Sequence, residues 1–131
     1  MTHLTPHNQQ TILRACAVYF VACGLSATYI PSSWLWASGL PTQVSPELSL
    51  TFGVIGAFML ALAAGAVIAS ARPAGNTGLI LTLAIANALD CVSTVKAVLS
   101  GSLPYINGLL FVAVAGAWTA ALLLTWRSAR R

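Results

Sequence analysis

Four long apolar runs alternate along the chain with short segments that contain polar residues, proline or glycine. The runs cover about residues 12–30, 48–71, 77–99 and 105–126. A helix needs roughly 20 mostly apolar residues to cross the hydrocarbon core of a bilayer, and each run is about that long. The pattern therefore predicts an all-α integral membrane protein. We expect residues 1–131 to form a single four-transmembrane-helix bundle.

The segment between the second and third runs is short and rich in helix-ending residues. Arg72 and Pro73 close the second run, and Asn76 or Thr77 can cap the third. Such a short turn makes the second and third helices antiparallel neighbours. At the start of the second run, Ser45 and Glu47 flank Pro46 in the order expected for a helix N-terminus.

Residues 31–46 separate the first two runs and contain three prolines and Gly39. We expect an outer loop that lies along the membrane surface. Tryptophan favours the headgroup region because its ring is apolar and its N–H is polar, and lysine can extend its ammonium group there. The expected interface anchors are Trp34, Trp36, Lys96 and Trp126.

Composition agrees with a lipid-facing surface. Of the 131 residues, 58% are hydrophobic and 6% are charged, whereas a soluble domain has about 25% charged residues. The net charge of +4 comes from a few residues near helix ends, so we expect the lipid bilayer, and no nucleic acid, as a partner. Three cysteines lie inside apolar runs, where they are expected as small packing residues.

The basic residues are distributed unequally between the two ends of the predicted helices. Five fall on the side that holds both termini, and Lys96 alone lies toward the other side. The five are Arg14, Arg72, Arg127, Arg130 and Arg131. Lys and Arg are retained in the cytoplasm, so the sequence predicts a multi-pass protein of the bacterial inner (plasma) membrane with both termini cytoplasmic.

The second run carries a small residue at every fourth position, which places these residues along one stripe of a helix. Small stripes let transmembrane helices approach closely where lipid removes the hydrophobic driving force. We expect a helix-packing stripe that contacts another helix of this chain, with a second copy as the alternative. Its members are Gly53, Ala57, Ala61, Gly65 and Ala69.

Asp90 is the most informative residue, because it lies thirteen positions into the third helix. At 1.5 Å per residue it is about 20 Å from the cytoplasmic end, where a carboxylate costs on the order of 2.5 to 3.5 kcal/mol. Asn87, Cys91 and Thr94 share its helix face at spacings of three and four, and Ser93 lies beside them. These five residues form the candidate intramembrane polar site.

The role of Asp90 stays open between two interpretations. A protonated Asp90 that bonds to Asn87, Thr94 or a facing hydroxyl would link helices. Alternatively, Asp90 is a proton or cation site in a small cavity, helped by Tyr19, Tyr29 or Asn107. Lys96 is six residues away, about 240° around the helix and about 9 Å further out, so it makes no natural ion pair.

Recognisable enzyme motifs are missing from the sequence. It has no HExxH, GxSxG, CxxC or haem motif and no phosphate-binding glycine loop. We therefore expect no catalytic residues, no metal and no cofactor, although this leaves the question of an enzyme open.

Several short features recur in a known arrangement: Gly24-Leu25 late in the first run, Leu40-Pro41 in the loop, Glu47 opening a glycine-rich second run, and Arg72-Pro73 after it. With these features the layout resembles that of small four-helix bacterial inner-membrane proteins of the DoxX-like kind. That resemblance implies an accessory subunit of redox or quinone-linked membrane systems, and Asp90 is not part of the shared pattern.

Two functions from different classes follow. The first is a non-enzymatic accessory, scaffold or immunity-type protein that contacts another membrane protein, or itself, through its helix faces. The alternative is a small proton- or cation-linked transporter, or a ligand-binding membrane protein, that uses Asp90 and functions as a dimer.

The topology prediction can be tested with reporter fusions. A reporter that works only in the cytosol should be active when it is fused after Arg131, and a reporter that works only outside the cytosol should be inactive there. The reason is that the arginines retain that end in the cytoplasm. A fusion within residues 38–44 should show the opposite behaviour. Activity of the C-terminal fusion on the outer side alone would contradict the predicted orientation.

Overall fold

The computed structural model describes residues 4–130, and these form a helical bundle in which no strand occurs. Four of the helices are long and apolar enough to span a membrane, which confirms the predicted fold class. They are α1 (Pro6–Tyr29), α3 (Pro46–Ala71), α4 (Thr77–Leu99) and α5 (Tyr105–Ala129). Two short elements complete the fold, α2 (Pro31–Ala37) and the 3₁₀ turn η1 (Pro73–Asn76).

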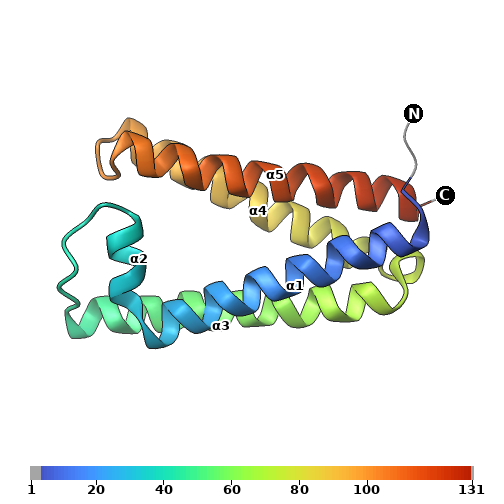
Figure 1. The fold of residues 1–131 in the computed structure, drawn as a ribbon, viewed down its shortest axis with the longest axis horizontal. Coiled ribbons are helices and arrows are strands. Elements are labelled where there is room, and N and C mark those ends of the chain that lie inside the picture. The colour runs from blue at the N-terminus through green and yellow to red at the C-terminus, as the bar shows by residue number, and fades with distance from the viewer. Residues whose placement is uncertain (1–3, 131) are drawn as a thin grey trace.

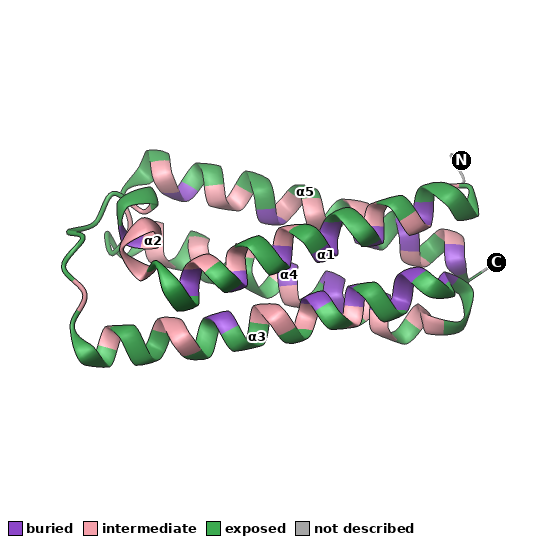
Figure 2. Ribbon diagram, turned by 60° about the horizontal axis from the view of Figure 1, so that its bottom comes forward, coloured by how far each residue is buried: buried purple, intermediate pink, exposed green. Residues whose placement is uncertain are grey.

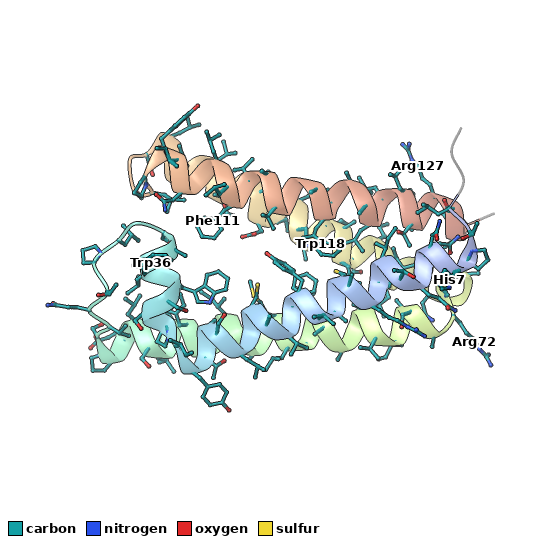
Figure 3. The ribbon with its side chains drawn as sticks, viewed as in Figure 1. His7, Trp36, Arg72, Phe111, Trp118 and Arg127 are labelled. Carbon is teal, nitrogen blue, oxygen red and sulfur yellow. The ribbon has the colours of Figure 1, made fainter. Side chains whose placement is uncertain are left out.

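The long helices form two close pairs, α1 with α3 and α4 with α5 (Figure 1). The start of α1, the end of α5 and the turn between α3 and α4 lie at one end of the bundle, which we call the arginine end because Arg72 and Arg127 lie there (Figure 3). The opposite end carries α2 and the α4–α5 turn, and we call it the α2 end. Arg131 lies outside the described residues.

Helix caps set the ends of the first two spans. The hydroxyl of Thr5 accepts a hydrogen bond from the N–H of Asn8, and Pro6 takes the first helical position, so α1 begins six residues before the apolar run does. Ser45 caps α3 in the same way through the N–H of Leu48, at 3.2 Å. The apolar runs thus predicted the four spans, while the polar caps determine where each begins.

The expectation that residues 31–46 form only a loop is wrong for the first half of that segment. Pro31 occupies the first turn of α2, and Gly39 ends the helix with a φ of +70°. The N–H of Gly39 bonds to Trp36 and the N–H of Leu40 to Leu35, both at 2.9 Å, which is a Schellman C-cap. Proline at the start and glycine after the end favour a short helix over a loop.

The buried core lies at the arginine end, where all four long helices contribute to it (Figure 2). Small side chains predominate, and they allow the two pairs to approach there. The N-terminal segment closes this end further, because the N–H of Leu4 donates to the hydroxyl of Ser128 at 3.2 Å. The core residues are Leu13, Cys16, Ala17, Phe20, Ala63, Ala66, Ala69, Ile80, Leu83, Ala84, Leu122 and Ala129.

Toward the α2 end, close packing continues only within each pair. Gly24 of α1 and Gly56 of α3 lie against each other: a Cβ placed on Gly56 would lie 2.7 Å from the carbonyl oxygen of Gly24 and would overlap the hydroxyl of Thr28. Burial of Gly56 and exposure of Ala57 show that the face of α3 that meets α1 is offset from the predicted stripe.

The predicted stripe therefore needs correction as an intramolecular contact. Ala69 is buried in the core, and Gly65 contacts Leu79 of α4. Ala57 and Ala61 are exposed, and a Cβ on Gly53 would meet no described atom within 4 Å. The period-four rule selected a real row of small residues, but it could not decide which of two adjacent rows faces α1.

The contact between Gly24 and Gly56 leads to a stability prediction. Gly56→Ala should destabilise the folded protein in detergent by about 1 to 3 kcal/mol, because the new methyl group overlaps backbone that cannot move independently. Gly53→Ala is the matched control on the same helix and should be neutral. Equal thermal stability of the two variants would contradict the observed α1–α3 interface.

Candidate functional site

A cavity lies between the two helix pairs on the α2 side of the core. It consists of three adjoining compartments of about 180, 190 and 330 Å³ that all share Tyr19. We call it the outer cavity. Its principal lining residues are Tyr19, Cys23, Trp34, Met59, Asn87, Asp90, Thr94 and Phe111.

Aromatic side chains bound this cavity toward the arginine end. Tyr19 of α1 lies 5.5 Å from Trp118 of α5, measured between ring centroids, and 5.6 Å from Phe20. Tyr19 and Trp118 also pack against the buried core. The cavity therefore begins where aromatic contacts replace the small core residues.

The short helix α2 bounds the other side through Trp34. Its indole N–H donates to the hydroxyl of Ser26 in α1 at 2.9 Å, and its ring is parallel to that of Phe111 in α5 with centroids 6.5 Å apart. Asn107 of α5 also donates to the carbonyl of Ala37 at 2.7 Å. These contacts attach α2 to both helix pairs, so α2 closes the space between them.

Asp90 lines two compartments of the cavity, one in the centre and one between α3 and α4. Its carboxylate forms no hydrogen bond or ion pair with any side chain of residues 4–130. Thr94 donates instead to the backbone carbonyl of Asp90 at 2.9 Å, and the amide of Asn87 donates to the carbonyl of Leu83 at 2.9 Å. Asn87 and Thr94, the two named partners expected for a helix-linking Asp90, therefore donate their hydrogen bonds elsewhere.

The predicted polar site separates into two groups. Asn87, Asp90 and Thr94 line the outer cavity. Cys91 is turned toward α5, where its thiol lies 3.9 Å from the carbonyl of Val112, and Ser93 is exposed and lines none of the three compartments. The sequence spacings of three and four residues placed all five residues on one broad face of α4, but only the centre of that face lines the outer cavity.

Of the three helper residues considered for Asp90, the structure brings Tyr19 to the site. Tyr29 is exposed, and Asn107 is occupied in holding α2. Met59 and Phe111 enter the cavity from α3 and α5 without having been predicted. They had no polar or charged character to distinguish them from lipid-facing residues in the sequence.

The expected interface anchors have mixed outcomes. Trp36 is 75% exposed at the α2 end and lines none of the three compartments, and Lys96 is exposed as well. Trp126 packs against the core, with the guanidinium of Arg130 at 4.8 Å from its ring. Trp34 is not an outward anchor, because its ring is held between Ser26, Phe52 and Phe111 inside the bundle.

The outer cavity combines one acidic group with aromatic and apolar walls. A carboxylate can accept a proton, or it can bind a cation that brings its own charge into the cavity. Within the described part of the chain, no three His, Cys, Asp or Glu side chains come together as they would around a metal ion. The arrangement is suited to holding one positive charge.

No known protein family, curated protein or solved structure matches this chain. The likeness to DoxX-like proteins thus rests on the sequence pattern alone.

Proposed function

We propose that this chain is a cation-binding protein of the bacterial inner membrane, with both termini in the cytoplasm and the outer cavity as its binding site. The carboxylate of Asp90 in that cavity has no hydrogen-bond or ion-pair partner among residues 4–130, and this observation carries the proposal. The gathering of Arg72, Arg127 and Arg130 at one end supports the orientation.

Energetics favour a ligand over a purely structural role for Asp90. An acid in the membrane interior costs on the order of 2.5 to 3.5 kcal/mol unless it is compensated. A helix-linking role would offset this cost through hydrogen bonds between side chains, whereas the carboxylate makes none with the described residues. A bound cation would offset it directly, and only while the ligand is present.

The cavity opens laterally between α3 and α4 and is closed toward the arginine end. The core fills the arginine end with residues of all four long helices, whereas Asp90 is exposed between α3 and α4 on the α2 side. Binding therefore needs no rearrangement, and transport would need the core to open or a second copy to complete a path. Binding is the function that this arrangement supports best.

The proposal predicts a specific loss in Asp90→Asn. Opposite unit charges about 4 Å apart attract each other by about 4 kcal/mol at an effective dielectric constant of about 20. Asp90→Asn removes the negative charge, so the variant should bind cations at least about ten-fold more weakly than the unmodified protein. The measurement is calorimetry on the detergent-purified chain with sodium, tetramethylammonium and phenyltrimethylammonium chlorides.

Glu47→Gln is the matched control, because Glu47 is the other acid of the chain and lies exposed at the start of α3. It should bind as the unmodified protein does. If no cation of the panel binds, or if Asp90→Asn binds equally well, the proposed function is wrong.

An accessory role is the second candidate, and the exposed positions of Ala57 and Ala61, with the open space beside Gly53, favour it. These residues form an unfilled small-residue row on α3 that a helix of another membrane protein, or of a second copy, can approach closely.

This second candidate predicts contact at Ala57. In a variant with Cys16, Cys23 and Cys91 replaced by alanine, Ala57→Cys should form a crosslinked product in native membranes, and adding Ala61→Leu should reduce it several-fold by blocking close approach. Val92→Cys, exposed on α4, is the control and should not crosslink. If Ala57→Cys stays uncrosslinked, as Val92→Cys is expected to do, association through this row is excluded.

A further inference from the structure

Few oxygen atoms face the two compartments that Asp90 lines. Apart from the carboxylate, their side-chain oxygens belong to Tyr19, Ser38, Asn87 and Thr94. Calcium takes about 6 to 8 oxygen ligands and magnesium an octahedral set of 6. The side chains of this lining do not supply the ligand set of either divalent cation.

Aromatic rings supply what the oxygens do not. Tyr19 from α1, Trp34 from α2 and Phe111 from α5 line the same compartment as Asp90 from α4. The faces of such rings carry negative partial charge and attract a cation within about 6 Å of the ring centroid. Figure 3 shows Phe111 pointing from α5 into the space between the helix pairs.

The ring of Trp34 is held in position before any ligand arrives. Its N–H is satisfied by Ser26, and the rings of Phe52 and Phe111 lie 6.5 Å from it. Its edge is therefore occupied, while the indole still lines the compartment. A pre-positioned ring loses little conformational freedom when it binds a ligand.

The entrance between α3 and α4 is apolar. It is lined on α3 by Ile55, Phe58, Met59 and Leu62, and Phe58 is 70% exposed toward the surroundings that lipid occupies. A fully hydrated ion would lose its water along such a path, whereas a cation with hydrocarbon around its charge would not. Compartments of about 180 to 330 Å³ limit the ligand to a small molecule.

From these four observations we propose that the ligand is a small organic ammonium ion with an apolar or aromatic body. Its charge lies beside Asp90, and its alkyl groups contact Tyr19, Trp34 and Phe111. This inference rests on the proposed function, since it names the class of cation that the Asp90 site takes.

The test uses ligands that differ only in charge. Phenyltrimethylammonium and tert-butylbenzene have nearly the same shape, so calorimetry on the full detergent-purified chain, corrected for micelles alone, separates charge from shape. We expect phenyltrimethylammonium to bind and tert-butylbenzene to compete at least about 100-fold more weakly. Sodium chloride should weaken the binding no more than lithium chloride at the same ionic strength does.

Variants then test the aromatic contacts. Trp34→Leu and Phe111→Leu should each weaken phenyltrimethylammonium binding about ten-fold, which corresponds to about 1.4 kcal/mol. Trp36→Leu, on the outward face of the same short helix, should have no effect. Trp34→Phe keeps an aromatic face and should retain more affinity than Trp34→Leu, which separates ligand contact from loss of packing.

The outcomes distinguish this inference from the proposed function. Asp90-dependent binding of sodium that phenyltrimethylammonium does not displace would overturn the inference and leave the proposed function in place. Equal binding by Trp34→Leu, Phe111→Leu and the unmodified chain would also overturn it. Absence of any Asp90-dependent binding would overturn both.

Discussion

Close packing of small side chains at the arginine end holds the two helix pairs together and determines the arrangement of the bundle. Lipid offers helices no hydrophobic reason to associate, so they approach only where side chains leave room. Ala17, Ala66 and Ala84 come from three different helices and meet in this core, which draws both helix pairs together. Tyr19 and Trp118 make the next contact between the two pairs, and beyond them small side chains no longer bring the pairs together, so the outer cavity begins there.

This division of the bundle gives Asp90 its unusual surroundings. One half of α4 is packed through Ile80 and Leu83, and the following turns face a space that the core does not fill. A carboxylate at that boundary keeps the rigid support of the core and remains open to a ligand. The short helix α2 completes the arrangement, because Trp34 and Asn107 join the two pairs at the end that has no common core. Rigid support and an open, singly charged cavity are together what a binding site for a small cation requires.

Much of the fold could be predicted from the sequence, because a span of apolar residues is a direct physical requirement of the bilayer. The four helices and the depth of Asp90 follow from that requirement. Helix α2 was missed although Pro31 and Gly39 mark its two ends, because three prolines and two tryptophans in one segment suggested an interfacial loop. The cavity itself could not be predicted, since Tyr19, Trp34 and Phe111 are distant in the sequence and nothing in their spacing shows that they meet. The spacing of small residues in α3 likewise predicted a packing row, but spacing alone could not show which row of the helix faces α1.

Charge-selective modification of Cys23 tests most directly whether the outer cavity holds an uncompensated negative charge that ligands can reach. Cys23 lines the cavity beside Tyr19, whereas Cys16 is fully buried, so a variant that keeps Cys23 as its single cysteine reports on this space. In liposomes, a cationic methanethiosulfonate reagent should modify Cys23 about ten-fold or more faster than an anionic one, since a cavity of one sign concentrates the opposite charge. The preference should disappear in Asp90→Asn. Equal rates with Asp90 present, or no modification by either reagent, would contradict the account.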